Sequence, residues 1–265
     1  MGRRQTRPET VLRHRAAGGL HEMQAIEDQL IVEEPLSIRL DGALVGTTMR
    51  TPGHDFELAV GFCFTEGFLD EASVSGVRFC GDDVGVANRF NAITVETDGR
   101  APSPAPRLGL VSSSCGWCGS EMIEAMCARL EPLVRRPPID AEVLASVPGA
   151  VAHEQAVFAA TGAAHGAAVF DRRGAVRLVR EDVGRHNAVD KVVGAMLLDR
   201  CLPANDLGLF VSGRASVEMV QKAWAAGFST LLAVSAPTSL AVTSARRANL
   251  NLTGFVRNEN FNVYA

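Results

Sequence analysis

From about residue 140 onward, short apolar segments alternate with longer segments of helical pattern, and this alternation constrains the fold more than any other feature. The short segments are rich in Val, Leu, Ala and Phe, as buried strands are, and the longer ones repeat apolar residues at helical spacing. Strands that alternate with helices form a sheet with a largely parallel central part and helices on both faces. The chain from 121 to 265 is therefore expected to be an α/β/α unit. The expected strands are 167–171, 175–181, 206–212, 230–235 and 252–256, and the expected helices are one that ends near Gly162, then 185–200, 217–226 and 239–248.

A smaller α+β domain is expected before it, over residues 26–98. Asp41-Gly42 lies in the middle of an alternating segment, which is the pattern of a two-residue β-hairpin. Residues 55–69 carry apolar side chains on one helical face, and Gly67 can end that helix. Strand-like segments near 77–80 and 92–97 complete the domain.

The remaining segments are expected to lack regular structure. Residues 1–25 are predicted to be a basic, disordered tail, and 99–120 a linker and mobile loop, because 99–107 is rich in Pro, Ala and Gly.

The composition is that of an ordinary globular protein, with 47% apolar residues, 21% charged residues and a net charge of −4, which argues against nucleic acid as a partner. No apolar segment approaches the roughly 18 residues of a membrane span, and the first residues lack the apolar core of a signal peptide. A cytoplasmic protein without a membrane partner is expected.

Two of the six cysteines stand apart from the others. Cys115 and Cys118 have the C-x-x-C spacing at which two sulfur atoms can touch, share a metal or act in redox chemistry, and Gly116 permits a tight turn between them. Structural zinc is disfavoured because no second Cys or His pair stands nearby at a suitable spacing. The other four lie among apolar neighbours and are expected to be small buried side chains: Cys63, Cys80, Cys127 and Cys201.

The setting of this thiol pair favours a mobile nucleophile. A helix predicted from residue 121 favours the thiolate through its free N–H groups, although Glu121 and Glu124 oppose that effect. A linker and three serines precede Cys115, where a thioredoxin-like protein would have a buried strand. A thiol that moves between two partners fits a group carrier better than a fixed oxidoreductase, although redox and metal chemistry remain open at this point.

Two loops at neighbouring strand ends have the pattern of anion sites. The first is 181–187, where Arg185 and His186 lie at the N-terminus of a predicted helix. The second is 212–216, which carries Ser212 and Arg214 just before the next predicted helix. Together they indicate an extended, phosphorylated ligand. The alternative for the first loop is a helix cap in which Asp182 pairs with Arg185. His165, at the start of a strand, is a candidate site residue if it lies beside His186, and otherwise an ordinary core histidine.

The same region has the layout of a zinc deaminase without its chemistry. The deaminase signature is H-x-E followed by P-C-x-x-C. Here Ala188 stands two positions after His186, where the signature has Glu. Thr238 and Ala241 stand one and four positions after Pro237, where the signature has its two cysteines. Such a frame can serve only as a binding platform, with no zinc.

Four segments of the chain closely resemble the FdhD family of formate dehydrogenase accessory sulfurtransferases. They are CGWCG from Cys115, EDVGRHNAVDKVVG from Glu181, SGRASVEMVQKA from Ser212 and SAPTSLAV from Ser235, and the resemblance extends from Glu34 to the closing NFNVYA. One departure is visible, because Ala163 stands where the family commonly has the second glycine of T-G-G-x-H. A Cβ atom at this position narrows the approach of the backbone to a ligand, which weakens the assignment of His165 as a site residue and leaves that of the thiols unchanged.

The resemblance implies a function and a set of site residues. Cys115 would accept sulfur as a persulfide from a cysteine desulfurase, with Cys118 as its helper, and would deliver it to the molybdenum bis-guanine-dinucleotide cofactor before insertion into formate dehydrogenase. It further implies a cytidine-deaminase-like C-terminal domain, a homodimer, and cofactor contacts at Arg257, Asn258, Glu259, Asn260, Phe261 and Asn262, beside Arg214, Ser212, Arg185, His186 and His165. A dithiol oxidoreductase and a non-enzymatic cofactor chaperone are the alternatives.

Overall fold

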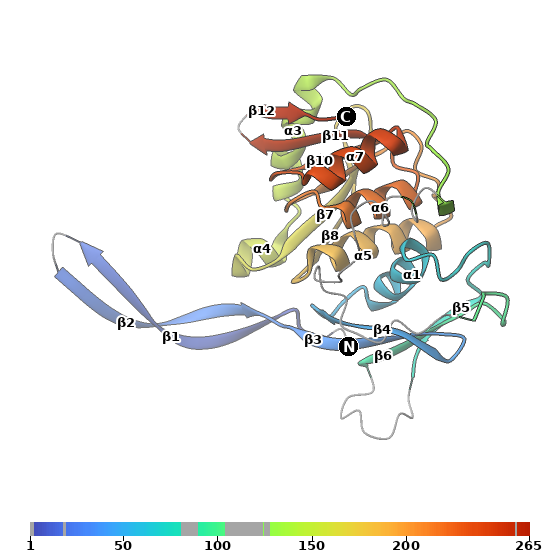
Figure 1. The fold of residues 1–265 in the computed structure, drawn as a ribbon. Helices are drawn as coiled ribbons and strands as arrows, with labels where there is room; N and C mark the ends of the chain where they lie inside the picture. The colour runs from blue at the N-terminus through green and yellow to red at the C-terminus, as the bar shows by residue number, and fades with distance from the viewer. Residues whose placement is uncertain (1–2, 18–19, 81–89, 104–123, 125–127, 258) are drawn as a thin grey trace.

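The structure is a computed structural model that describes residues 3–17, 20–80, 90–103, 124, 128–257 and 259–265. Its strands form sheets of two, four and six strands within these ranges. Figure 1 shows the six-stranded sheet with its helices, the four-stranded sheet beneath them, and the two-stranded sheet projecting to one side.

The six-stranded sheet is the centre of the C-terminal unit and has the order β12-β11-β10-β9-β7-β8. β9, β10 and β11 are parallel, whereas β7 runs antiparallel to both of its neighbours. The predicted alternation of strands and helices is confirmed, and β12 is a strand that the sequence pattern did not predict. The strands are β7 (His165–Phe170), β8 (Val176–Asp182), β9 (Gly208–Val211), β10 (Thr230–Ala233), β11 (Asn251–Arg257) and β12 (Asn260–Val263).

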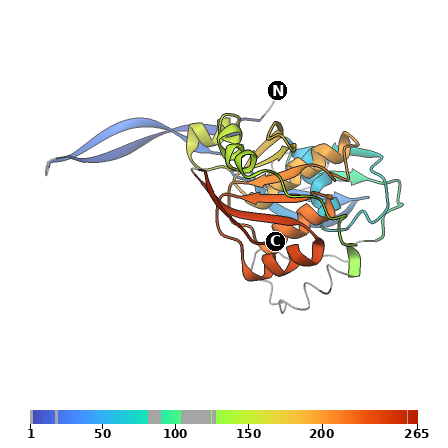
Figure 2. The same cartoon turned by 90° about the horizontal axis from the view of Figure 1, so that it is seen from above.

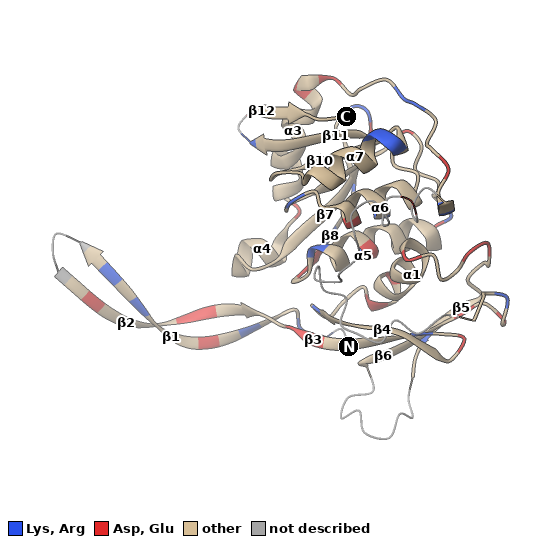
Figure 3. Ribbon diagram, viewed as in Figure 1, with Lys and Arg blue, Asp and Glu red and all other residues tan. Residues whose placement is uncertain are grey.

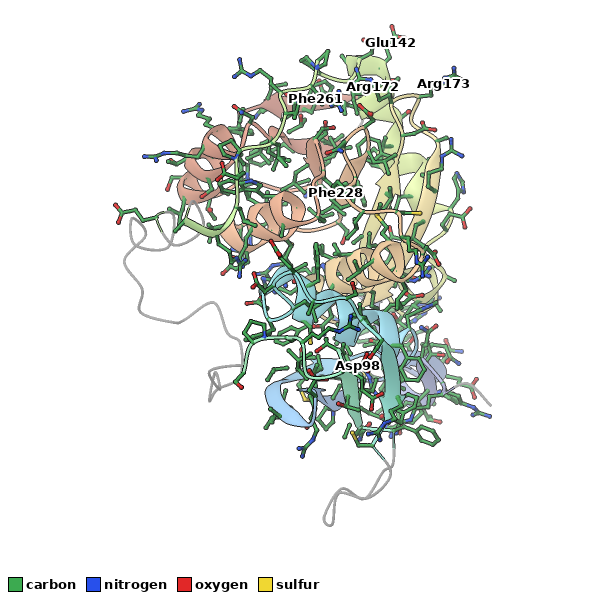
Figure 4. All side chains as sticks on the ribbon, turned by 90° about the vertical axis from the view of Figure 1, so that its right-hand side faces the viewer. Asp98, Glu142, Arg172, Arg173, Phe228 and Phe261 are labelled. Atoms are coloured by element: carbon green, nitrogen blue, oxygen red, sulfur yellow. The ribbon has the colours of Figure 1, made fainter. Side chains whose placement is uncertain are left out.

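Helices cover both faces of this sheet, as expected. α5 (Arg185–Leu198), α6 (Val217–Ala225) and α7 (Ser239–Ala248) bury one face, around Trp224 and Phe228. α3 (Ala141–Ala152) buries the other face, where Val147 packs with Phe210. The short α4 (Ala156–Thr161) ends at Gly162, which has a φ of +66°. Figure 4 shows Phe228 inside this unit.

The N-terminal unit is a four-stranded sheet covered by one helix. Its strand order is β4-β3-β6-β5, and Asp41 and Gly42 form the predicted hairpin turn with φ values of +47° and +88°. The predicted helix is confirmed, and Gly67 follows it with a φ of +78°. The elements are β3 (Glu34–Leu40), β4 (Ala43–Arg50), α1 (Asp55–Thr65), β5 (Gly76–Phe79) and β6 (Ala92–Glu96).

The two units meet where α1 crosses α5 with almost no side chain between the two backbones. A Cβ atom at Gly61 would overlap the backbone carbonyl oxygen of Asp190, and a Cβ atom at Gly194 would overlap that of Glu57. The contact is reciprocal, so both positions require glycine because of the close approach rather than because of a turn.

The expectation of a disordered tail over residues 1–25 is wrong for residues 6–17 and 20–25, which lie in strands. β1 (Thr6–Ala17) and β2 (Leu20–Ile31) form an antiparallel ribbon, which projects from the body in Figures 1 and 2. Cross-strand pairs such as Val11 with Ile26 supply the apolar contacts that the pattern, diluted by charged residues, did not reveal. The expected boundary between residues 25 and 26 falls inside β2.

The predicted thiol loop lies outside the described residues, as do Cys115, Cys118, Cys127 and most of the helix predicted after them. Of the other cysteines, Cys63 is buried as expected, Cys80 is half-buried, and Cys201 is exposed because it follows the end of α5. The expectation of a buried side chain is therefore wrong for Cys201.

The close crossing of α1 and α5 can be tested with two small substitutions. Gly61→Ala and Gly194→Ala are each expected to lower the free energy of unfolding by about 1–3 kcal/mol, because two backbones must separate to admit a methyl group. Urea denaturation monitored by circular dichroism measures this.

Gly149 provides the matched control, since it also lies in a helix but a Cβ atom there would have no neighbour within 4 Å. Gly149→Ala is expected to leave stability unchanged or to raise it by up to about 1 kcal/mol. If Gly61→Ala unfolded at the same urea concentration as the unmodified chain, the close crossing would be contradicted.

Candidate functional site

One edge of the six-stranded sheet collects most of the predicted site residues. β8, β9, β10 and β11 end at this edge, and β7 begins there because it runs antiparallel. Open α/β sheets bind ligands in this position, outside the carboxyl ends of their strands.

His165, Arg185 and Ser212 come together at this edge from three different segments. The Ser212 hydroxyl lies 3.4 Å from Nδ1 of His165 and accepts a hydrogen bond of 2.9 Å from the backbone N–H of Gly166. A Cβ atom at Gly213 would lie 3.6 Å from both the Arg185 Cδ and the His165 Nδ1, so this glycine leaves open the space between them. The sequence predicted these three side chains, but not that they meet.

The electrostatics of this cluster favour an anion. Burial and the nearby Arg185 guanidinium lower the pKa of His165, so the imidazole is neutral at pH 7. The Nε of Arg185 is buried and donates to no acceptor in the part of the chain that the structure describes. Arg185 is also the first residue of α5, where free backbone N–H groups add a positive potential. The cluster can therefore bind a phosphate through Arg185 and the helix N-terminus.

The second predicted anion loop is less favourable. Glu218 lies in the first turn of α6, and although burial opposes ionisation, hydrogen bonds from Ser216 and from the backbone lower its pKa. Its carboxylate therefore occupies part of the positive potential at this helix N-terminus. Arg214 is exposed at the surface of the same loop, where it remains available to a ligand.

His186 belongs to a different environment from His165. Burial, together with the charges of Lys222 and Arg185, lowers the pKa of His186 to about 4. Lys222 lies at the junction of α1, α5 and α6, where its Nζ contacts the Asp190 carboxylate at 2.8 Å and the Thr65 hydroxyl at 2.9 Å. Burial opposes the charge of this ammonium, but Asp190 and Glu66 outweigh it and raise the pKa of Lys222.

The predicted ion pair between Asp182 and Arg185 is wrong, because Asp182 has another partner. Its carboxylate lies 2.7 Å from Nζ of Lys191 with both side chains fully buried, and it accepts hydrogen bonds from the backbone N–H groups of Gly184 and Thr51. Lys191 also donates to the Thr51 carbonyl at 2.9 Å. This arrangement joins the two units and leaves the Arg185 Nε free of Asp182.

Asn187 extends the same network. Its amide donates to the Met49 carbonyl at 2.7 Å and accepts from the Thr48 hydroxyl at 3.0 Å. Neither Asn187 nor Lys191 was singled out from the sequence. Their contacts with Met49 and Thr51 join residues more than 130 positions apart along the chain.

The predicted C-terminal contacts lie on the hairpin of β11 and β12, two strands beyond β9. Arg257 and Glu259 are exposed there, and Nε of Arg257 donates to the Val234 carbonyl at 3.3 Å. Asn260 and Asn262 are also at or near the surface, whereas Phe261 packs against the core beneath α3. Figure 4 shows Phe261 at the end of the molecule that also bears Glu142 and Arg172. Asn258 lies outside the described residues.

Phe255 is a further candidate on this hairpin that the sequence did not indicate. Its ring is 44% exposed and its backbone has a φ of +57°, a conformation that is costly for an aromatic residue. It follows Gly254 at an irregularity in the pairing of β11 with β12.

Arg129 ties the described chain that follows the thiol segment to the body of the protein. Its guanidinium donates to the backbone carbonyls of Glu66 and Thr65 at 2.5 and 3.1 Å. The chain is therefore held at the end of α1, beside Lys222, at a point 11 residues after Cys118.

Two features are absent from the described part of the chain. It holds no cluster of three or more His, Cys, Asp or Glu side chains placed to bind a metal ion. None of its helices combines the length and the apolar character that a membrane span requires.

The fold is that of a mixed α/β protein, and this sheet edge is a candidate anion site formed by a helix N-terminus and neighbouring strand ends. The family model of FdhD/NarQ matches residues 31–265, and the chain belongs to that family.

The similar proteins include two that are named sulfur carrier protein FdhD. The one from Mycolicibacterium paratuberculosis is 44% identical over 246 residues, covering 89% of this chain and 90% of that protein. The one from Nocardia farcinica is 45% identical, covering 90% and 87%. A crystal structure from Desulfotalea psychrophila, described as a formate dehydrogenase accessory protein, superposes with a TM-score of 0.76 over 97% of this chain and 96% of that one, at 24% identity. It supports the fold.

The environment of His186 predicts a specific pH dependence of stability. Its pKa is about 4 in the folded chain, against 6.5 for a histidine in water, so between these values the unfolded chain binds more protons and stability falls as the pH is lowered. His186→Leu removes this contribution. The stability difference between the unmodified chain and the variant is expected to shrink by about 2–3 kcal/mol from pH 7 to pH 4.

Urea denaturation of both proteins across this pH range measures the difference, and other titrating groups cancel because both proteins contain them. A difference that stayed constant from pH 7 to pH 4 would show that His186 is not held neutral.

Proposed function

We propose that this protein is a sulfur carrier that accepts sulfur from a cysteine desulfurase on Cys115 and transfers it to the molybdenum bis-guanine-dinucleotide cofactor, before that cofactor enters formate dehydrogenase. The observation that carries the proposal is the match to proteins named sulfur carrier protein FdhD along about nine-tenths of the chain. The C-x-x-C pair and the anion site supply the two kinds of group that this role needs. The protein would work in the cytoplasm as a sulfurtransferase.

The first proposed step is a transfer between cysteines. The Cys115 thiolate attacks the outer sulfur of the desulfurase persulfide, so that a new S–S bond forms, the old S–S bond breaks and the desulfurase cysteine leaves as a thiolate. No net oxidation or reduction takes place. Cys115 then carries one additional sulfur atom as a persulfide.

The second step gives Cys118 a role. Its thiolate attacks the inner sulfur of the Cys115 persulfide, which forms a Cys115–Cys118 disulfide and releases the outer sulfur as sulfide. The outer sulfur is reduced by two electrons, and the two cysteines are oxidised by the same two. Molybdenum accepts the sulfide in place of an oxygen ligand, which leaves as water. A cellular dithiol would then reduce the disulfide.

The described residues would hold the cofactor as cargo. Arg185, with His165 and Ser212, fits one phosphate group, and Arg214 lies on the next loop along the sheet edge. The hairpin that carries Arg257 is two strands beyond β9, or about 10 Å away at the usual strand spacing. That distance suits an extended nucleotide rather than a single phosphate.

Two finer expectations belong to the same proposal. The C-terminal unit would be a cytidine-deaminase-like frame used as a binding platform, and the order β8-β7-β9-β10-β11 with antiparallel β7 is compatible with this. The working form would be a homodimer.

The carrier proposal predicts a mass change on a single residue. After incubation with a cysteine desulfurase and cysteine, the chain is expected to gain about 32 Da, the mass of one sulfur atom, on Cys115. Cys115→Ser should gain none, because a hydroxyl does not attack the persulfide. Cys118→Ser should still gain the sulfur but retain it when the cofactor is added. Mass spectrometry of the intact chain and of its peptides measures these outcomes.

The two alternatives predict other results. A dithiol oxidoreductase would show no retained sulfur by mass spectrometry, and in a separate assay it would reduce insulin disulfides. A non-enzymatic cofactor chaperone would bind the cofactor with neither activity. Loading of Cys115→Ser at the level of the unmodified chain would exclude Cys115 as the carrier.

The proposed anion site predicts which arginines matter for nucleotide binding. With GDP as the probe, Arg185→Ala and Arg214→Ala are each expected to weaken binding about 10- to 100-fold, the loss of one charge-assisted hydrogen bond. Isothermal titration calorimetry measures the affinity.

Arg173→Ala is the matched control, because Arg173 is an exposed arginine in the turn between β7 and β8, at the opposite edge of the sheet. If GDP affinity fell equally in all three variants, the loss would reflect the change in net charge alone, and a localised site would be contradicted.

A further inference from the structure

The ribbon of β1 and β2 is the part of the molecule with the least support from the rest of the chain. Its twelve-residue strands pair along their whole length, from Thr6 with Ile31 to Ala17 with Leu20, and they form a sheet of their own. Figures 1 and 2 show it extending away from the body in both views. A two-stranded ribbon alone in water is marginally stable, so this one gains stability if it packs against something.

The outer half of the ribbon has the features of a contact surface. Leu12 is 66% exposed and Met23 is 62% exposed, the two largest exposures among the large apolar side chains of β1 and β2 whose burial the structure describes. Both lie on one face, because Leu12 pairs with Ala25, and Met23 pairs with His14 two residues further along. The outer edges of β1 and β2 also carry backbone N–H and C=O groups with no strand beside them in the described chain.

We propose that this edge binds a second copy of the chain, through antiparallel pairing of β1 with β1 about a two-fold axis at Leu12. The two ribbons then form one four-stranded sheet across the dimer. Main-chain hydrogen bonds provide the affinity, as in other strand-addition complexes, and the contact uses the same surface on both copies.

The charge pattern of β1 is self-complementary in this register. With Leu12 opposite Leu12, Glu9 of each copy stands opposite Arg15 of the second copy, which gives two opposite-charge pairs by symmetry. Among the described residues Glu9 has a weak surface ion pair with Arg7 at 3.3 Å, and it stands opposite Asp28 in its own ribbon, where like charges disfavour the pair. Pro8 limits the pairing to the segment from Glu9 to Arg15, because it has no N–H to donate.

The edge of β2 does not offer the same complementarity. Centred on Ala25, two β2 strands would place Glu22 opposite Asp28 of the second copy, twice by symmetry. Like charges directly opposite each other destabilise a strand pair. The sequence therefore favours the β1 edge over the β2 edge as the contact.

A charge exchange tests both the surface and the register. Glu9→Arg alone places arginine opposite arginine, and Arg15→Glu alone places glutamate opposite glutamate. Each variant is expected to raise the dimer dissociation constant about 10- to 100-fold in analytical ultracentrifugation of the full chain. When the two variants are mixed, opposite charges face each other again at both pairs, and a one-to-one heterodimer is expected with the affinity of the unmodified chain.

The mixing experiment distinguishes this contact from damage to the ribbon itself. Arg15→Glu also faces Glu22 within its own ribbon, but that effect is the same in the variant alone and in the mixture. Dimers of either variant as tight as the unmodified chain, a mixture that stays monomeric, or an unmodified chain that is monomeric at all concentrations would each overturn the proposal.

A crosslink tests the two-fold axis independently. Leu12→Cys places two cysteines opposite each other across the axis, about 5 Å apart between Cα atoms, and is expected to form a covalent dimer on mild oxidation. Met23→Cys, equally exposed on β2, is the matched control and should stay at the background level of the native cysteines. Equal crosslinking of the two variants would contradict pairing through β1.

Discussion

The contact between Gly61 and Gly194 is the constraint on which the rest of the structure depends. Because α1 and α5 cross with their backbones touching, the two units pack directly against each other, although each has its own hydrophobic core. The crossing brings Thr65 at the end of α1 to the Asp190 carboxylate and to Lys222 of α6. Buried charges need partners at short range, and here they come from three helices, α1, α5 and α6.

The packing of the two units also explains why most residues of the loop 181–187 have a structural role. In the sequence, 181–187 has the pattern of an anion-binding loop with two candidate cations. In the structure, Asp182 and Asn187 hold the end of β4 and the residues after it, and His186 is kept neutral inside the junction. The buried Nε of Arg185 has no hydrogen-bond partner among the described residues. Most of this motif therefore has a structural role, and Arg185 is the side chain of the motif that is proposed to contact a ligand.

Local patterns in the sequence predicted the elements well, and long-range pairing set the limit. Asp41-Gly42, Gly67 and Gly162 mark turns and helix ends that depend on a few neighbouring residues. The hydrogen bond from Lys191 to the Thr51 carbonyl depends on how the two units dock, which no local pattern encodes. The ribbon of β1 and β2 was missed for a related reason, because charged residues interrupt its alternation along both strands (Figure 3). The meeting of His165 with Ser212 follows from the antiparallel direction of β7, which the predicted parallel central part of the sheet did not include.

Helix α5 connects the two ends of the proposed transfer. Its first residue, Arg185, faces the sheet edge, and Asp190 faces the junction where Lys222 and Glu66 lie. Five residues of helix separate them, a rise of about 7.5 Å. At that junction Arg129 donates to the Glu66 carbonyl and holds the described chain that follows the thiol pair in sequence. In the proposed function, one helix would therefore hold the cargo through its first residue and support, through Asp190 and Lys222, the point where this chain is anchored.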